Sequence, residues 1–427
     1  YLQRVLQLAE QNAPTLDLTE FDTDWQGEAY QSVSGQNANN SVRVTSEFLD
    51  AVKEQKDWDL IRRTDGSVHR TVPAADIWNR IARAAWQSAD PGIQYDTTIN
   101  EWHTAPAQGR INGSNPCSEY MFLDDTACNL ASINLLKFVD DGDFNIEAYE
   151  HATRLWTVVL ETSVLMAQFP SREIALRSYD YRTLGLGYAN LGAMLMVEGI
   201  PYDSPESLAW TGALTAILTG VSYSTSAEMA AELGAFPRYD ENREAMLRVI
   251  RNHRRAAYGV DATEYEDLTV LPVPIDEAFC REDLLTAARD SWDRALELGE
   301  AHGYRNAQTS LIAPTGTIGL LMDCDTTGVE PDFALVKFKK LAGGGYFRII
   351  NGSVPAALAK LGYGREQAAA IVEYCVGSAV LEGSPHINRY SLAERGFTQP
   401  VLDTIDGQLS TAFHLCFAFN RYVLGDD

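Results

Sequence analysis

Apolar residues recur at helical spacing in two long segments of the chain. In the first, residues 73–90, Ile77, Ile81 and Ala85 recur every four positions, and the sequence Asp-Pro-Gly then stops the pattern. The same pattern recurs over 147–169, and start and stop signals or charges at helical spacing predict three further helices, over 204–233, 241–258 and 282–302. Long amphipathic helices therefore dominate the predicted secondary structure.

One short segment has the pattern of a strand. Residues 307–313 (AQTSLIA) are rich in β-forming residues and end at Pro314, so helix and strand alternate here as in an α/β protein. Segments 131–138 and 183–187 are too short for periodicity to separate a buried strand from a helical turn, and both stay open. Because no repeat or linker marks a boundary, we expect a single large α/β unit.

Composition and charge narrow the class of protein. The 427 residues are 45% hydrophobic and 22% charged, which suits a large buried core and excludes a disordered or collagen-like chain. Lys and Arg total 34 against 59 Asp and Glu, and the net charge of −25 repels a polyphosphate backbone. We therefore expect no nucleic acid partner, although backbone N–H groups can still hold a small phosphate.

The chain carries no sequence signal for a membrane or for export. No apolar run approaches about 18 residues, and Gln, Arg, Glu and Asp stand near the start, where a signal peptide needs apolar residues.

The six cysteines, at 117, 128, 280, 324, 375 and 416, never form C-x-x-C, which favours neither a disulfide framework nor a zinc site. We expect a cytoplasmic protein with no membrane partner and no metal ligands. The first residue is not Met, and the last follows an apolar run, so we also expect a piece of a longer protein.

The densest group of reactive residues is Asn115-Pro-Cys-Ser-Glu119, with Cys128 following soon after. If this segment is extended, Asn115, Cys117 and Glu119 point to one face. Such a site combines a sulfur that can exchange hydrogen, a carboxylate that can move a proton and an amide that can orient either group. A small buried cysteine in a loop beside an exposed glutamate explains the same residues without catalysis, so both interpretations stay open.

A second candidate site is Pro314–Ile318 (PTGTI), directly after the predicted strand. The hydroxyls of Thr315 and Thr317 and several backbone N–H groups would converge there, as a phosphate site requires. An ordinary strand-to-helix turn, with Gly316 for its backbone and a threonine cap, accounts for the same pattern. Another glycine pair, Gly185-Leu-Gly187, lacks the rest of a dinucleotide fingerprint and indicates packing.

Several segments together resemble the catalytic subunit of ribonucleotide reductase. They are Asn115-Pro-Cys-Ser-Glu-Tyr, Cys128-Asn-Leu-Ala-Ser-Ile-Asn-Leu, Arg182-Thr-Leu-Gly-Leu-Gly, Ala313-Pro-Thr-Gly-Thr-Ile-Gly and Gly328-Val-Glu-Pro. Their order and spacing also agree, over nearly the whole chain. Three more stretches are most similar to the class II, adenosylcobalamin-dependent branch: Ser34-Gly-Gln-Asn-Ala-Asn-Asn-Ser, Tyr95-Asp-Thr-Thr-Ile-Asn-Glu-Trp-His and residues 322–346.

The resemblance implies a fold and a set of site residues. The fold is a ten-stranded α/β barrel of two antiparallel five-stranded halves, incomplete in this chain, with a central finger loop that shields a radical from solvent. Cys117 would carry the thiyl radical, Glu119 would be the general base, Asn115 would orient the substrate and Cys128 would be one of two reducing thiols. The implied substrate-binding residues are Asn115, Pro116, Cys117, Ser118, Glu119, Pro314, Thr315, Gly316, Thr317 and Ile318.

The implied activity is the radical reduction of ribonucleotides to 2′-deoxyribonucleotides for DNA synthesis. Adenosylcobalamin would be the cofactor, and an external dithiol such as thioredoxin the reductant. Residues 1–427 would form the central catalytic region, whereas we expect the effector-binding part, the second reducing cysteine and the last strands and tail to lie outside it. A homodimer or a partner chain would complete the barrel. Two alternatives stay open: a class I subunit served by a separate radical-generating metalloprotein, and a non-catalytic module of a split enzyme.

Overall fold

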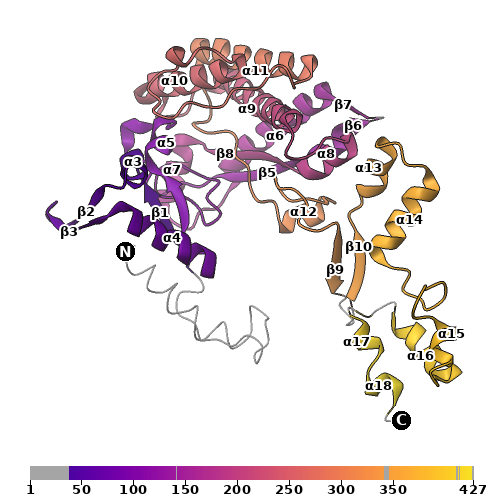
Figure 1. Ribbon diagram of the computed structural model, residues 1–427. Helices are drawn as coiled ribbons and strands as arrows, with labels where there is room; N and C mark the ends of the chain where they lie inside the picture. The colour runs from indigo at the N-terminus through magenta and orange to yellow at the C-terminus, as the bar shows by residue number, and fades with distance from the viewer. Residues whose placement is uncertain (1–37, 141, 341–345, 410–411, 413, 426–427) are drawn as a thin grey trace. The chain divides into compact units, whose positions relative to one another are not determined.

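The computed structural model describes residues 38–140, 142–340, 346–409, 412 and 414–425 (Figure 1). These residues fall into two units, although the sequence marked no boundary between them. The first unit holds the described residues up to Ala131, together with Glu150–Gly187 and Gly212–Ala313. The second holds Ser132–Tyr149, Tyr188–Thr211 and the described residues from Pro314 onward.

Short strands and long helices make up the first unit and the segments that it shares with the second. The strands are β1 (Ser41–Val44), β2 (Asp57–Ile61), β3 (Val68–Pro73), β4 (Gly92–Tyr95), β5 (Asn129–Asn134) and β8 (Leu184–Ala189). The helices are α3 (Ser46–Lys53), α4 (Ala74–Ser88), α5 (Asp96–Glu101), η1 (Pro106–Gln108), α6 (Ile146–Met166), α7 (Arg172–Tyr181), α9 (Pro205–Leu233), α10 (Tyr239–Tyr258), η3 (Ala262–Glu264) and α11 (Glu282–His302).

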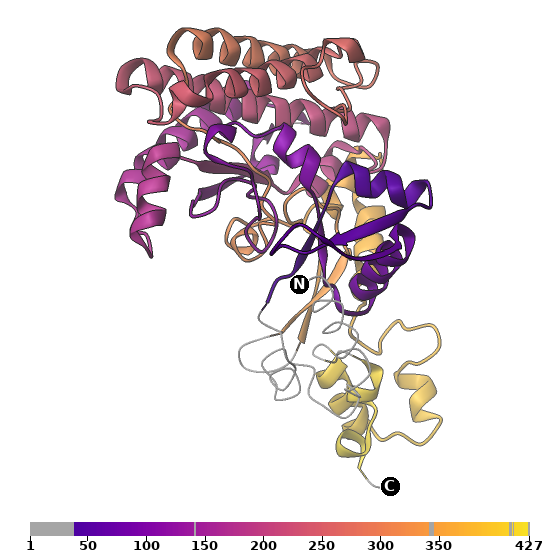
Figure 2. The ribbon, with the colours of Figure 1, turned by 90° about the vertical axis from the view of Figure 1, so that its left-hand side faces the viewer.

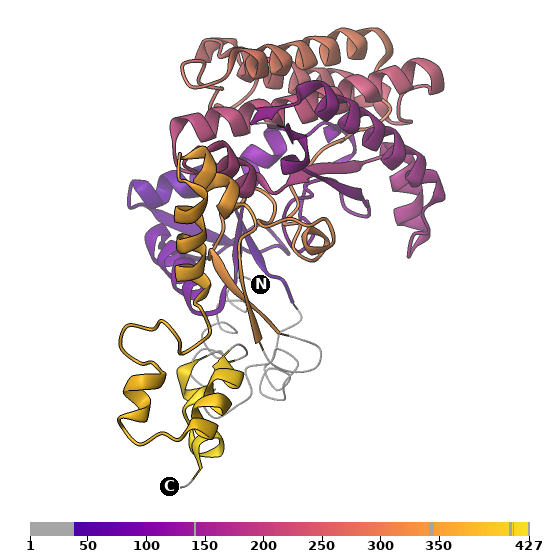
Figure 3. The same ribbon diagram turned by 90° about the vertical axis from the view of Figure 1, so that its right-hand side faces the viewer.

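The second unit is made mainly of short elements. After β5 come η2 (Leu135–Phe138), β6 (Val139–Asp140) and β7 (Asp143–Phe144), and after β8 comes α8 (Leu191–Glu198). Its later part runs through α12 (Thr317–Leu321), β9 (Val336–Lys340), β10 (Tyr346–Ile350), α13 (Val354–Lys360), α14 (Arg365–Val376), α15 (Arg389–Ala393), α16 (Gln399–Leu409), α17 (Leu415–Ala418) and α18 (Arg421–Leu424). Helices α13 and α14 follow the hairpin of β9 and β10, and α14 packs beside β10 (Figure 3).

All five predicted helices are present, as α4, α6, α9, α10 and α11. The strand predicted over 307–313 is wrong in extent, because only Ser310 forms a bridge, to Leu186. The segment still runs along β8, where the N–H of Leu311 donates to the Leu186 carbonyl at 3.0 Å. The two segments that periodicity left open contain the paired strands β5 and β8.

The α/β class is confirmed, whereas the described residues do not show a closed barrel. In the described residues, the strands pair in five two-stranded sheets, among them a parallel pair, β1 with β4, and an antiparallel hairpin, β2 with β3. These pairs do not close into a barrel within that part of the chain. The ten-stranded barrel of two antiparallel halves therefore stays a proposal.

The core of the first unit lies against α10 and α11, which run side by side (Figure 2). Helix α11 buries Leu284, Ala288, Trp292 and Ala295 at helical spacing, as its apolar pattern predicts. The hydroxyl of Tyr258 on α10 donates to Asp293 of α11 at 2.7 Å, on the more exposed side of the pair. The two helices form one wall of the unit, and Trp292 of α11 is buried in its core.

The glycine pair of β8 has the packing role that the sequence indicated. Every residue of β8 is buried, and a Cβ atom on Gly185 would collide with the side chains of Leu130 and Leu311. A Cβ atom on Gly187 would collide with the backbone carbonyl of Leu311. Glycine is required at both positions because neighbouring segments approach the strand closely.

Among the described residues, no helix combines the length and the apolar content that crossing a membrane requires.

Candidate functional site

The reactive segment Asn115–Glu119 is a turn in the first unit. The N–H of Ser118 donates to the carbonyl of Asn115 at 3.1 Å, and Ser118 has a φ of 65°. The segment is therefore not extended, so the condition under which strand alternation would place Asn115, Cys117 and Glu119 on one face is not met. Asparagine followed by proline is a common start of a turn, which explains the local conformation.

The turn exposes the thiol of Cys117. The family resemblance implied a thiol shielded from solvent, and the structure differs because no closed barrel surrounds the turn in the described residues. Asn115 is half-buried, and its Oδ1 accepts a hydrogen bond from the N–H of Tyr120 at 3.0 Å. Pro116 is exposed, whereas Ser118 is half-buried with its Oγ 3.4 Å from Gln94 Nε2.

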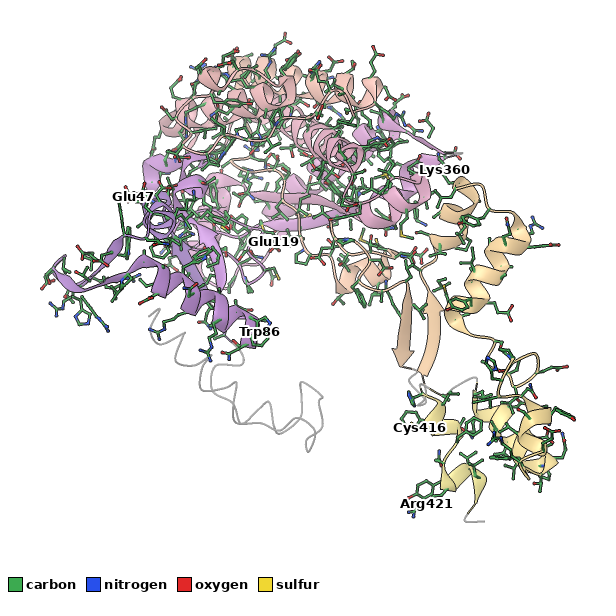
Figure 4. All side chains as sticks on the ribbon, viewed as in Figure 1. Glu47, Trp86, Glu119, Lys360, Cys416 and Arg421 are labelled. Atoms are coloured by element: carbon green, nitrogen blue, oxygen red, sulfur yellow. The ribbon has the colours of Figure 1, made fainter. Side chains whose placement is uncertain are left out.

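Glu119 and Cys128 lie near each other inside the same unit. Glu119, labelled in Figure 4, comes from the loop between η1 and β5, and its Oε2 is buried without a hydrogen-bond partner among the described residues. Burial raises the pKa of the Cys128 thiol to about 12, and the negative charge of Glu119 adds to that rise. The pair thus offers a proton acceptor beside a thiol that stays protonated at neutral pH.

A polar cleft of about 390 Å³ opens beside the turn. Amide and hydroxyl side chains dominate its lining, which is formed by Asn39, Ser41, Arg43, Gln94, Asn112, Gly113, Ser114, Asn115 and Pro116. The guanidinium of Arg43 is already paired with Asp96 at 2.8 Å, so the lining presents little free charge. Such a cleft suits a neutral ligand rich in hydrogen-bonding groups.

The cleft contains part of one class II-like stretch, since Asn39 and Ser41 close the motif that begins at Ser34. Residues 34–37 of that motif, and residues 341–345 of the stretch 322–346, lie outside the described residues. Gln94, which sequence reasoning did not select, is 4% exposed and donates to Ser114 Oγ at 2.7 Å. Gln94 immediately precedes the class II-like stretch that begins at Tyr95, and this position is the sequence feature that could have identified it.

The candidate phosphate loop, Pro314–Ile318, lies in the second unit and leads into α12. Thr315 is 4% exposed and has a φ of 51°, which is unusual for a β-branched residue. Such a conformation costs of order 1–3 kcal/mol and persists only where the surroundings hold it. Pro314, Gly316, Thr317 and Ile318 are exposed, whereas the Thr315 hydroxyl is buried against Ser132, so Thr317 is the threonine of this loop that is open to solvent.

Two side chains of β5 contact this loop and the end of the short helix that follows it. Ser132 Oγ lies 3.1 Å from Thr315 Oγ1, and Asn134 Nδ2 donates to the Met322 carbonyl at 3.1 Å. The buried amide of Asn190 extends the support, because its Oδ1 accepts from the N–H groups of Asp325 and Thr326, each at 3.0 Å. A rigid frame therefore maintains the strained loop.

The structure brings the site residues together in two groups. Asn115, Cys117, Glu119 and Cys128 belong to the first unit, and Pro314–Ile318 to the second. The expectation that both groups face one cavity stays a prediction. Within the part of the chain that the structure describes, no three His, Cys, Asp or Glu side chains gather in a metal-binding arrangement.

Comparison with known proteins extends these observations. The family model described as the ribonucleotide reductase barrel domain matches residues 16–393. Vitamin B12-dependent ribonucleotide reductases from Agrobacterium fabrum and Bradyrhizobium diazoefficiens are 60% and 59% identical to this chain over its whole length. A vitamin B12-dependent ribonucleoside-diphosphate reductase from Mycobacterium tuberculosis is 29% identical over 71% of the chain.

The chain spans about a third of the length of these relatives, 34% of the first two and 36% of the third. The barrel-domain match nevertheless covers most of the chain and includes both candidate loops. The chain therefore belongs to the ribonucleotide reductase family.

Proposed function

We propose that the protein containing this sequence, called the full chain below, is an adenosylcobalamin-dependent ribonucleotide reductase. It would make 2′-deoxyribonucleotides for DNA synthesis. The observation that carries this proposal is the turn that presents the Cys117 thiol between Asn115 and Glu119, with Cys128 beside Glu119. The names of the similar proteins support the vitamin B12 dependence. They also favour it over a class I subunit, and family membership gives no support to a non-catalytic module.

In the proposed reaction, a thiyl radical at Cys117 removes the hydrogen from C3′ of the ribose, so an S–H bond forms as the C3′–H bond breaks. Glu119 accepts the proton of the 3′-hydroxyl, and Asn115 orients the sugar. The 2′-hydroxyl leaves as water after gaining a proton from the thiol pair. Cys128 and a second thiol then supply the hydrogen that replaces the hydroxyl at C2′, give up two electrons in total and become a disulfide, while Glu119 returns its proton to the 3′-oxygen. Cys117 finally returns its hydrogen to C3′ and regains the radical.

The protonation state of Cys128 fits this role. A thiol must keep its hydrogen until the substrate intermediate needs it, and a pKa of about 12 keeps Cys128 protonated throughout the physiological range. The nearby carboxylate of Glu119 reinforces that state because a thiolate would be repelled by its charge. The same carboxylate has an oxygen without a hydrogen-bond partner in the described residues, so it can accept a proton from substrate.

The cleft beside the turn fits part of the proposed cofactor. Adenosylcobalamin carries its metal within its own ring, so a protein site needs hydrogen-bonding groups along the periphery of the ligand. Asn39, Ser41 and Asn112 offer amide and hydroxyl groups of that kind. When bound, the cofactor would supply the oxidising equivalent for the radical at Cys117.

We propose the remaining features on the family resemblance. Residues 1–427 would contribute to a ten-stranded barrel of two antiparallel halves, completed by further chain or by a partner. A dithiol protein such as thioredoxin would reduce the disulfide, and the substrate would be a ribonucleoside diphosphate or triphosphate.

A titration of the full chain with adenosylcobalamin, with and without nucleotide, tests the cofactor directly. We expect saturable binding that becomes tighter when nucleotide is present. No binding under either condition would contradict the proposed dependence.

The phosphate loop gives a testable prediction of its own. Thr317 begins α12 and is exposed, and its hydroxyl would donate a charge-assisted hydrogen bond to substrate phosphate. Such a bond contributes about 1.5–3 kcal/mol, so Thr317→Val should weaken nucleotide binding roughly tenfold or more. The measurement is the nucleotide dissociation constant of the full chain.

A matched control for this change is Thr286→Val, at an exposed threonine within α11. It should leave the dissociation constant unchanged. If Thr317→Val also binds nucleotide as the unmodified chain does, the loop is an ordinary capped turn and has no phosphate-binding role.

A further inference from the structure

Tyr120 is the residue that connects the Cys117 turn to the neighbourhood of Cys128. It ends the motif that begins at Asn115, and its side chain is 7% exposed in the core of the first unit. Its backbone N–H donates to Asn115 Oδ1 at 3.0 Å. One end of the residue therefore fixes the amide that would orient the substrate.

The other end of Tyr120 reaches the segment before Cys128. Its hydroxyl donates to Thr126 Oγ1 at 2.9 Å and lies 2.9 Å from Thr183 Oγ1. The Thr183 hydroxyl in turn donates to the carbonyl of Ala127 at 2.6 Å. Hydrogen bonds thus connect Tyr120 to the turn through Asn115 and to Thr126, and Thr183, which contacts the same hydroxyl, holds Ala127 just before Cys128.

From these contacts we infer that Tyr120 is a positioning residue, whose hydroxyl sets the Cys128 thiol relative to Glu119. The catalytic meaning of this geometry rests on the proposed function, but the geometry itself does not. Phenylalanine at this position would keep the ring and its packing while deleting the hydroxyl. The segment Thr126–Cys128 would then lose one attachment to the core, and the thiol would become more accessible to water.

The titratable groups that face Cys128 are Glu119 and Tyr120 itself. Tyr120 stays neutral at ordinary pH, because burial raises its pKa above the usual value. A change in Cys128 reactivity after Tyr120→Phe therefore reflects altered position and hydration of the thiol, since no charged group is lost. This property makes the reactivity of Cys128 a direct reporter of the inferred role.

The test is alkylation of Cys128 by iodoacetamide in the full chain, followed by peptide mass spectrometry from pH 7 to pH 11. Only the thiolate reacts, so a fall of one pKa unit speeds alkylation about tenfold at any pH well below the pKa. We expect a shift of about that size in Tyr120→Phe. Tyr304→Phe is the matched control, since it removes another buried tyrosine hydroxyl of the same core cluster, one that donates to the Ala295 carbonyl at 2.8 Å.

A Cys128 profile in Tyr120→Phe that matches the unmodified chain would overturn the inference. An equal shift in Tyr304→Phe would also overturn it, because general loosening of the core would then explain both. If Tyr120→Phe does not fold, Thr183→Val should show the same shift, as it removes the adjoining hydroxyl. A normal profile in that variant would count against the inference.

The turnover of Tyr120→Phe is a second measurement, which tests this inference separately from the proposed function. If both hold, kcat of Tyr120→Phe falls about tenfold or more while KM for the nucleotide stays the same, because only the placement of the reducing thiol has changed. An alkylation shift in a chain with no reductase activity would support the inference and contradict the proposed function. Reductase activity with no alkylation shift would support the proposed function and contradict the inference about Tyr120.

Discussion

Cys117→Ser is expected to abolish deoxynucleotide formation by the full chain while nucleotide binding stays nearly unchanged. The O–H bond of serine is stronger than the S–H bond of cysteine, so a hydroxyl cannot take part in the same reversible hydrogen transfer. Cys117 is exposed on a hydrogen-bonded turn, and the exchange of sulfur for oxygen leaves that turn intact. The loss should therefore appear in turnover and not in the fold or in substrate affinity.

The chain provides a matched control for this variant. Cys416, labelled in Figure 4, is also exposed and lies among the short helices near the end of the described residues. Cys416→Ser removes an equally accessible thiol and should keep full activity. Repeated turnover by Cys117→Ser above background would remove Cys117 from the central role, whatever the control shows.

Glu119→Gln should lower turnover by about 10²–10⁴-fold with little change in substrate affinity, because proton transfer by a positioned base contributes that much. Glutamine has the size of glutamate and can hydrogen-bond, but it cannot accept the proton of the 3′-hydroxyl. The substitution should also change the pKa of the Cys128 thiol. Since the charge of Glu119 helps to raise the Cys128 pKa, the variant should move that pKa down from about 12 towards its ordinary value of 9.0.

The measurements for this variant are kcat and the nucleotide dissociation constant, determined separately. Glu206→Gln changes an exposed carboxylate in the first turn of α9 and should alter neither quantity. A deficit of Glu119→Gln that lies wholly in substrate affinity would indicate a binding role for Glu119. Unchanged turnover would exclude it as the general base.

Sequence periodicity predicted helices such as α4 and α11 well because each has one buried and one exposed side. The segment 282–302 became α11 with the same bounds, and its buried residues are those of the apolar stripe. Strand β8 could not be recognised in this way, since all of its residues are buried and no alternation distinguishes its two faces. The segment 307–313 had strand-like composition but forms only a bridge, because pairing depends on neighbours far along the chain.

In the candidate site, too, residues close together in sequence could be predicted, whereas contacts between residues far apart in sequence could not. The residues Asn115, Cys117 and Glu119 are adjacent in sequence, so the motif itself identified them. Their conformation stayed open between an extended segment and a turn before Pro116, and the structure has the turn. The bond between Tyr120 and Thr183 joins residues 63 positions apart, and only the folded chain brings them together.

The central proposal is that the protein to which this chain belongs reduces ribonucleotides with adenosylcobalamin and a thiyl radical at Cys117. The most direct test is to incubate the full chain with a ribonucleotide and a dithiol, with or without adenosylcobalamin, and to measure the 2′-deoxyribonucleotide formed. The account predicts product over many turnovers when the cofactor is present and none when it is omitted. Equal product without the cofactor, or no product despite demonstrated binding of both cofactor and nucleotide, would contradict it.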